Sequence, residues 1–409
     1  MKTTFAGFEA VHSLEELVVG GDEKQKRMRR DPHIPDLLAV APGVEISNTT
    51  AYKNGEIILQ DKASCFPAYL LLGEGWGNGG DLVDGCAAPG NKTTHMASLL
   101  EPGKKPKSHI FSMDASAVRA KTLQKMVSTA GADNLVTVLP GQEFLALDPQ
   151  DPRFENVTGL LLDPSCSGSG IIGRDDVPEF ILPAGKPTGN QNQNPSKKRK
   201  RSGAQPQNPP PQSSNSTSST NPTSENDLPP AEITRDRLAK LSNIQTLIVT
   251  HALSFPSARK VTYSTCSIHL LENESVVARI LESEVAKRRG WRVLRRDEQP
   301  VGLRNWKSRG VKREKNSSAD NGNGDGNGHG NGHGKGEGEG EDTVGLSEDE
   351  LQGCMRCWPG DEEGTGGFFV VGFVRDENHS TSKLEVREED QDDTAEDDSD
   401  DQEWEGFSD

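Results

Sequence analysis

Short apolar runs alternate with segments of helical apolar spacing from Gly80 to Arg375. This alternation is typical of a parallel β-sheet that is covered by helices on both faces. Five runs are expected to form strands, 81–84, 109–114, 135–139, 157–163 and 259–264, and all but 135–139 end in a polar residue. Because open α/β sheets bind ligands beyond the carboxyl ends of their strands, a site is expected at these five ends.

Between and after these strands, apolar residues recur at helical spacing. Helices are expected over 115–129, 233–254 and 270–289, and 367–374 is expected to add a last strand. The pattern therefore predicts an α/β fold, Rossmann-like, with a mostly parallel sheet.

Three segments contain too little apolar surface to offset the entropy that ordering would cost. We expect disordered insertions at 184–230 and 316–343 and a disordered acidic tail at 376–409. Sheet-like sequence resumes after each insertion, so both are expected to lie within one domain over 61–375.

The formal net charge of the 409 residues is −17, which would usually disfavour a polyanionic partner. Between Glu385 and Asp409, however, 14 acidic residues and one arginine contribute −13 and leave −4 for the preceding 384 residues. The body of the chain is nearly neutral, so its charge does not argue against a nucleic-acid partner.

The six cysteines are scattered, and no secretory signal stands at the start of the chain, which predicts reduced intracellular thiols. The apolar runs are far shorter than the roughly 20 residues that span a bilayer, so no membrane partner is expected. Cys354 and Cys357 have metal-like spacing, but no second pair accompanies them in ordered sequence. His329 and His333 lie in a glycine-rich tract, and no metal site is expected.

A loop of small residues, Cys86-Ala87-Ala88-Pro89-Gly90, follows the first expected strand and precedes a helix over 95–100. A strand, tight loop and helix start in this order can bind a nucleotide-like ligand by close backbone approach. Neither the dinucleotide fingerprint nor the P-loop spacing is present, which disfavours phosphate binding.

The second expected strand ends in Asp114, where a carboxylate can accept hydrogen bonds from a ribose diol, and Arg119 follows on the next helix. Asp114 could equally serve as a helix N-cap ahead of Ala115. The loop and the acid together favour an adenosine ligand.

Two cysteines follow neighbouring strand ends, Cys166 in the segment from Asp163 to Gly170 and Cys266 after Thr265. A single cysteine at such a position is most often a small buried hydrophobe. Two at adjacent strand ends, facing one crevice, point instead to thiol chemistry.

These motifs resemble the NOP/Sun family of RNA cytosine-5 methyltransferases, over Cys86 to Thr93, Asp163 to Gly170 and Tyr263 to Ser267. The resemblance covers about Pro32 to Arg375 without the insertions, and the segment Ile58 to Ser64 is most similar to the large-subunit ribosomal RNA subgroup. It implies a class I S-adenosylmethionine-dependent methyltransferase fold, with large-subunit rRNA or a pre-ribosome as partner and a nuclear, nucleolar location. No obligate protein partner is evident.

The resemblance also implies roles for individual residues. Cys266 would be the nucleophile that adds to C6 of cytosine, and Cys166 would assist breakdown of the covalent adduct. The cofactor, S-adenosylmethionine, would be held by Cys86, Ala87, Ala88, Pro89, Gly90, Asn91, Lys92, Asp114, Arg119 and Asp163.

Asp163 and Lys92 are also expected to be catalytic. Asp163 can bind the N3 and N4 edge of the base, and Lys92 can orient Asp163 or lower the pKa of a thiol. Their structural alternatives are a loop cap for Asp163 and a solvated first helical turn for Lys92.

Contacts to RNA are harder to place. Basic residues cluster around Trp291 and Trp306, which suits phosphate contact plus base stacking, but a solvated helix end beside core tryptophans fits equally well. The basic run Lys197 to Arg201 is interpreted as a nuclear-import signal.

Residues 1–60 are expected to be the remnant of an N-terminal RNA-binding region, shorter than the family usually carries. Two other functions compete with the methyltransferase. A catalytically idle ribosome-assembly factor would not need intact Cys266, Cys166, Asp163 and Lys92. A DNA cytosine methyltransferase would carry its nucleophile in a Pro-Cys pair, whereas Ser165 separates Pro164 from Cys166 here.

Overall fold

A computed structural model describes residues 4–18, 26–73, 76, 79–100, 108–171, 234–313 and 343–376. The expected insertion at 184–230, the basic run at 197–201 and the acidic tail after Asp376 lie outside the described residues, as does the insertion at 316–343 except Thr343. The family-like motifs all lie inside them.

The strands of the described chain are β1 (Glu9–Ala10), β2 (Arg27–Arg30), β3 (Leu38–Val40), β4 (Asp81–Asp84), β5 (Ile110–Asp114), β6 (Val136–Pro140), β7 (Val157–Leu162), β8 (Lys260–Thr265), β9 (Trp291–Val293), β10 (Met355–Cys357) and β11 (Phe368–Arg375). The α-helices are α1 (Leu14–Val18), α2 (Thr50–Lys53), α3 (Lys62–Leu72), α4 (Asn91–Leu99), α5 (Ala117–Thr129), α6 (Arg235–Ala252), α7 (Glu274–Glu282), α8 (Glu284–Arg289), α9 (Val301–Arg304) and α10 (Glu348–Gly353).

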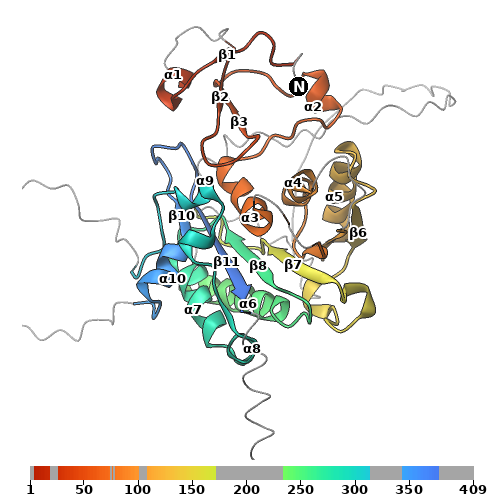
Figure 1. Ribbon diagram of the computed structural model, residues 1–409, viewed down its shortest axis with the longest axis vertical. Helices are drawn as coiled ribbons and strands as arrows, with labels where there is room; N and C mark the ends of the chain where they lie inside the picture. Colours follow the sequence, from red (N-terminus) through yellow and green to blue (C-terminus); the bar gives the residue numbers. More distant parts are fainter. Residues whose placement is uncertain are drawn as a thin grey trace, which may run out of the picture.

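An eight-stranded sheet forms the centre of the molecule, in the order β10-β11-β8-β7-β4-β5-β6, with β9 paired to β11 (Figure 1). The strands from β4 to β8 pair in parallel, and β11 joins β8 antiparallel. The five expected strands and the last strand are therefore present, within one or two residues of their expected bounds. Strands β1 to β3 form a separate three-stranded sheet.

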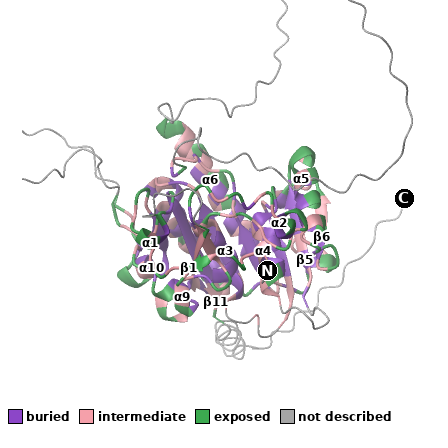
Figure 2. Cartoon of the chain, turned by 90° about the horizontal axis from the view of Figure 1, so that it is seen from above, coloured by how far each residue is buried: buried purple, intermediate pink, exposed green. Residues whose placement is uncertain are grey.

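Alternating residues of the sheet divide its apolar side chains between two faces. On one face Leu82 and Leu161 pack with residues of α3, α4 and α5. On the other face Val83 and Leu160 pack with residues of α6 and α7. The sheet is thus covered on both sides, as its continuous apolar strands require, and its centre is buried (Figure 2).

The helix expected over 270–289 is broken into three pieces. A 3₁₀ turn, Leu270–Glu272, ends at Asn273, whose dihedral angles of −112° and −100° are not helical. Ser283 then separates α7 from α8, and its hydroxyl accepts a hydrogen bond from the amide of Ala286. This break places the side chains of residues 272 and 273 within hydrogen-bonding distance of the segments at the ends of β7 and β8.

Lys62 joins the N-terminal segment to the central domain. Its ammonium lies 2.7 Å from Asp31 Oδ2, 2.6 Å from Glu363 Oε2 and 2.9 Å from His33 Nδ1. The ligand atoms of those three groups lie within 4.8 Å of one another, and the lysine ammonium takes the position that a cation would occupy. Ile34 also packs into a core cluster with residues of α3 and β11.

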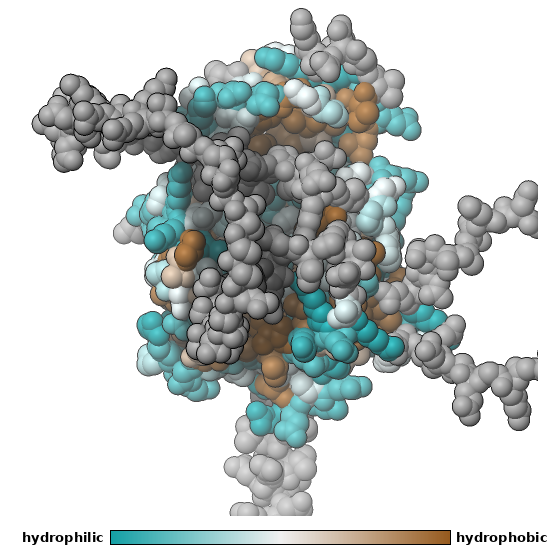
Figure 3. All heavy atoms as spheres, turned by 180° about the vertical axis from the view of Figure 1, so that it is seen from behind, coloured by the Kyte–Doolittle hydropathy of each residue, from teal (hydrophilic) through white to brown (hydrophobic). Residues whose placement is uncertain are grey.

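Few large hydrophobic side chains are strongly exposed among the described residues. The seven large hydrophobic side chains that are exposed there come from α1, α5, α6, α9 and loops, and hydrophobic spheres appear in separate patches (Figure 3). None of the described helices has the length and apolarity needed to cross a membrane.

Candidate active site

The two cysteines at the strand ends lie in contact. Cys166 follows β7, Cys266 directly follows β8, and these strands are paired in parallel, so both thiols emerge at the same edge of the sheet. Their Sγ atoms are 3.0 Å apart, and both residues are partly exposed. The sheet thus brings together two thiols that are 100 residues apart in the sequence.

The contact between the thiols shifts the pKa values of the two cysteines in opposite directions. The hydrogen bond with Cys166 lowers the pKa of Cys266, and Lys92 adds to this effect, although burial and Asp163 act against it. The same hydrogen bond raises the pKa of Cys166 well above its usual value, together with burial and the charges of Cys266 and Glu272. The proton of the pair is therefore held by Cys166, and Cys266 is the better thiolate.

Asp163 is held by two partners beside the cysteine pair. The ammonium of Lys92 lies 2.7 Å from Asp163 Oδ2, and the Ser264 hydroxyl donates to Oδ1 at 2.6 Å. Lys92 also donates to Ser64 Oγ at 3.0 Å and lies 5.6 Å from the centre of the Phe368 ring. Lys92 is therefore not a solvated residue of the first helical turn.

Burial acts to lower the pKa of Lys92, but the pairing with Asp163 outweighs it and the net shift is upward. Among the described residues, Ser64, Ser264 and Phe368 complete this group. Sequence reasoning gave none of them a role. The pattern alone contained a signal only for Ser264, which stands two residues before Cys266 on a strand whose end was expected to form the site.

The loop from Cys86 to Gly90 lies between the ends of β4 and β5. Arg119 Nη2 donates to the carbonyl of Ala88 at 2.8 Å and lies 3.4 Å from Asp114 Oδ2. Asp114 also accepts a hydrogen bond from the amide of Ser116, and Ser116, not Asp114, is the N-cap of α5. Arg119 thus connects the loop to the strand end that carries Asp114.

The loop approaches α5 closely. Gly90 has a φ of 118°, and a Cβ at this position would lie 3.1 Å from side-chain atoms of Leu123 and Met126. The backbone conformation and the space both favour glycine here. The bond between Ala88 and Pro89 is cis.

Two buried oxygens beside this loop have no hydrogen-bond partner among the described residues, Asp84 Oδ1 and Asn91 Oδ1. Burial raises the pKa of Asp84 to about 7, against the hydrogen bond that Thr93 donates to it. Unpartnered buried acceptors suit a ligand that carries donors and positive charge, as the ammonium and sulfonium groups of S-adenosylmethionine do. The residues of the loop therefore fit this cofactor.

Two glycines let the loop after β7 contact β11. The amide of Gly367 donates to the carbonyl of Gly170 at 2.7 Å, and Gly170 donates to the carbonyl of Cys266 at 2.9 Å. A Cβ on Gly170 would lie 2.1 Å from the Gly367 oxygen, which no real contact allows. Both glycines are required for the loop that carries Cys166 to reach Cys266.

The basic cluster around the tryptophans is structural in its central part. Trp291 and Trp306 are buried, so neither ring can stack on a base. Arg289 donates to the carbonyls of Leu253, Phe255 and Pro256, and Arg292 pairs with Glu298. Of the two interpretations that the sequence left open, the core tryptophan is the one observed.

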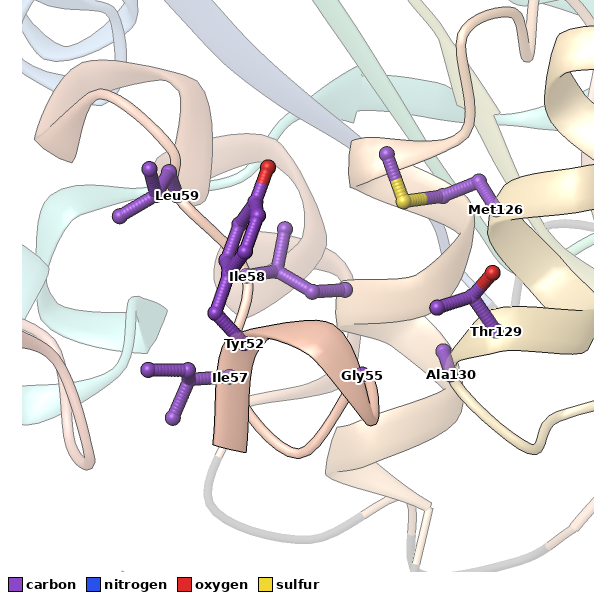
Figure 4. A pocket seen from close by; sticks show the side chains of 8 residues that line it. All are labelled: Tyr52, Gly55, Ile57, Ile58, Leu59, Met126, Thr129 and Ala130. Atoms are coloured by element: carbon purple, nitrogen blue, oxygen red, sulfur yellow. The ribbon is translucent and has the colours of Figure 1, made fainter. Parts of the chain in front are cut away.

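A small crevice lies away from the cysteine pair, between α2 and α5 (Figure 4). It is lined by Tyr52, Gly55, Ile57, Ile58, Leu59, Met126, Thr129 and Ala130, and none of these side chains is charged. A Cβ on Gly55 would meet the Thr129 carbonyl oxygen at 2.0 Å, which shows how closely the two segments pack. The crevice marks the junction at which residues 52–59 pack on the C-terminal part of α5.

The fold, the loop and the site define the class of this protein: it has the fold of the class I methyltransferases, whose cofactor is S-adenosylmethionine. A similar fold occurs in a methyltransferase homologue from Pyrococcus horikoshii, with a TM-score of 0.52 at 18% identity, covering 86% of this chain and 79% of that one.

Sequence comparison narrows the class. Residues 76–179 match the family model for the 16S rRNA methyltransferases RsmB/F, and residues 4–60 match that for the ferredoxin-like domain of NOL1/NOP2/Sun domain family member 5. Over these residues the chain is similar to the NOP/Sun family of RNA cytosine-5 methyltransferases.

Curated relatives carry related names. A 25S rRNA (cytosine-C(5))-methyltransferase of Schizosaccharomyces pombe is 39% identical over 307 residues, which is 75% of this chain and 52% of that protein. A 28S rRNA (cytosine-C(5))-methyltransferase of Mus musculus is 34% identical over 252 residues, or 62% of this chain and 42% of that protein. The chain thus spans about half the length of the relatives it matches.

Proposed function

We propose that this chain methylates C5 of a cytosine in large-subunit rRNA, through a covalent adduct between Cys266 and C6 of the base. The observation that carries the proposal is the contact between two thiols, 3.0 Å apart, beside the pair of Lys92 and Asp163. The names of the curated relatives support the rRNA substrate. We further propose that the chain acts in ribosome biogenesis, in the nucleus and its nucleolus.

Cytosine C5 is a poor nucleophile, and the proposed role of Cys266 is to change this. Its thiolate adds to C6, so that electron density moves onto C5 as in an enamine. The lowered pKa of Cys266 raises the fraction of thiolate available for this step. The loop from Cys86 to Lys92, with Asp114 and Arg119, would hold S-adenosylmethionine, which would supply the methyl group.

Asp163 is proposed to bind the base while this addition takes place. One of its oxygens can accept a hydrogen bond from the exocyclic N4 amino group, next to N3, where charge develops as the thiolate adds. Lys92 and Ser264 hold the carboxylate in place, which limits its reorientation. Lys92 also lies near Cys266, and its positive charge favours the thiolate.

Cys166 is proposed to help release the product. After methylation the C5 proton must leave, its electrons must form the C5–C6 double bond, and the bond from C6 to Cys266 must break. While Cys266 is a free thiolate, its hydrogen bond is the largest cause that raises the pKa of Cys166. Bonding of Cys266 to C6 removes that cause, so the pKa of Cys166 falls and a larger fraction of it is the thiolate that can accept the C5 proton.

Residues 61–375 are proposed to be the catalytic domain, and residues 1–60 part of an RNA-binding region. The match of residues 4–60 to a ferredoxin-like domain supports this division. The sheet of β1 to β3 is separate from the catalytic sheet, which agrees with it.

The test is transfer of labelled methyl groups from S-adenosylmethionine to large-subunit rRNA, with covalent RNA–protein adducts resolved on denaturing gels. Cys266→Ala should abolish both transfer and adduct, and Cys166→Ala should abolish turnover while the adduct accumulates. Cys354→Ala, which removes a buried core thiol outside this pair, is the control and should retain transfer. Wild-type protein that binds the cofactor but transfers no methyl group to rRNA would contradict the proposal.

A further inference from the structure

Glu272 is a buried acid for which the reaction above has no use. It ends the 3₁₀ turn after β8, and its side chain is 0% exposed. Its Oε1 accepts hydrogen bonds from the amide of Ser167 at 2.9 Å and from Gln245 Nε2 at 3.1 Å. Its Oε2 is buried and has no partner among the described residues.

These hydrogen bonds hold both neighbours of Cys166. Ser167 follows the cysteine and donates directly to Glu272. Gln245, which donates to Glu272, also donates to the carbonyl of Ser165, the residue before the cysteine, at 3.0 Å. Glu272 and Gln245 therefore fix the backbone on both sides of Cys166, at Ser165 and Ser167.

The next residue, Asn273, does the same for the other cysteine. The hydroxyl of Thr265, before Cys266, donates to Asn273 Oδ1 at 2.6 Å. Asn273 Nδ2 in turn donates to the carbonyl of Ser267, after the cysteine, at 2.9 Å. Two adjacent residues in the break between helices thus set the relative position of two thiols from different strands.

We propose that Glu272 is a positioning residue that holds Cys166 against Cys266 and, through its negative charge, keeps the shared proton on Cys166. This inference depends on the proposed function only for the catalytic role that is given to this proton. The hydrogen bonds and the burial that carry it belong to the described residues themselves.

The hydrogen bonds to Ser167 and Gln245 use only one of the two carboxylate oxygens of Glu272, so this geometry does not by itself require a glutamate. A glutamine would accept the same two hydrogen bonds through its single amide oxygen. A carboxylate adds a negative charge that is costly to bury, and no described partner repays that cost at Oε2. A negative charge beside a thiol disfavours its thiolate, in agreement with the raised pKa of Cys166.

Other groups also face Cys166 and must be kept constant in a test. The titratable groups that contribute around the pair are Cys266, Asp163, Lys92, Glu272 and Tyr263. Tyr263 donates its hydroxyl to the backbone carbonyl of Glu272 at 2.6 Å, and the charge of Glu272 adds to burial in raising the pKa of Tyr263.

The experiment measures the pH dependence of alkylation of Cys166 by iodoacetamide, with the modified site read by mass spectrometry, in the full chain carrying Cys266→Ala. Once Cys266 is removed, Glu272 is the main remaining charge that raises the pKa of Cys166. Adding Glu272→Gln should lower the apparent pKa of Cys166 by about one unit, which is roughly a tenfold faster alkylation at a fixed pH below that pKa.

Two further variants separate charge from geometry. Gln245→Met has a similar length, removes the hydrogen bonds to Ser165 and Glu272 and leaves the charge unchanged, so the apparent pKa of Cys166 should stay high. Glu272→Asp keeps the charge but shortens the side chain, and should also keep it high. Circular dichroism and thermal unfolding verify that each variant is folded before its thiol is assayed.

An unchanged pKa in Glu272→Gln, or an equal fall in Gln245→Met, would overturn the inference and leave Glu272 a structural residue. Because alkylation needs neither RNA nor cofactor, this result is independent of whether the chain methylates rRNA. In the chain with Cys266 present, Glu272→Gln should lower kcat at unchanged KM for RNA, with a pH profile displaced to lower pH; the same pH profile as wild type would count against the inference.

Discussion

The buried ion pair between Glu274 and Arg356 supports the segment after Cys266, the proposed nucleophile, and Arg356→Met should disrupt this pair. The two side chains are 0% and 2% exposed, and Arg356 Nε donates to Glu274 Oε1 at 2.7 Å. Arg356 Nη1 also donates to the carbonyl of Ile268, two residues after Cys266, at 2.8 Å. Methionine has a similar length and fills much of the space, so the lost interactions dominate the effect.

The expected loss of stability in Arg356→Met follows from the charge of Glu274, which stays buried without its partner. Glu274 would retain the hydrogen bond from the amide of Val311 but would lose its counterion in a fully buried position. Removing one partner of a buried ion pair costs about 3–5 kcal/mol, because the remaining charge stays desolvated. For a domain of this size such a loss lowers the Tm by roughly 10 °C.

Urea and thermal unfolding of wild type and Arg356→Met measure this difference, and the double variant Glu274→Leu/Arg356→Met is the control. Replacing both charges with apolar side chains should recover most of the lost free energy of unfolding, since no unpaired charge then remains. A loss below about 1 kcal/mol for the single variant, or no recovery in the double variant, would refute the reasoning.

Three further outcomes are expected. Cys166→Ala should raise the pKa of Cys266, because the hydrogen bond that most lowers this pKa is lost. The pH midpoint of Cys266 alkylation should therefore be higher than in wild type, and an unchanged midpoint would contradict this. Burial raises the pKa of Asp84 from 3.8 to about 7, so the stability of the cofactor-free protein should fall as pH rises from 4 to 7, and unfolding of Asp84→Asn should lack this fall. Lys62→Met should leave Asp31 and Glu363 without their ammonium partner and release the N-terminal segment. Limited proteolysis should then cleave faster before α3, and cleavage rates equal to those of wild type would show that Lys62 does not hold this segment.

Much of the central fold was predictable from sequence because its signals are local. Apolar runs of four to seven residues, four of the five ending in a polar residue, located β4 to β8. Helix α3 was not predicted, because its residues are buried almost all round and give no amphipathic period. The break at Asn273 was also missed, since apolar spacing continues through it while the backbone does not.

The sequence by itself determined which residue types stand at the strand ends: two cysteines, Asp163, and the loop before Lys92. These follow from strand and loop patterns that a single chain displays in order. Which thiol holds the proton was decided only by tertiary structure. That depends on a 3.0 Å contact between Cys166 and Cys266 and on the environment around it, and Coulomb interactions and desolvation are set by distance in space and not by separation along the chain.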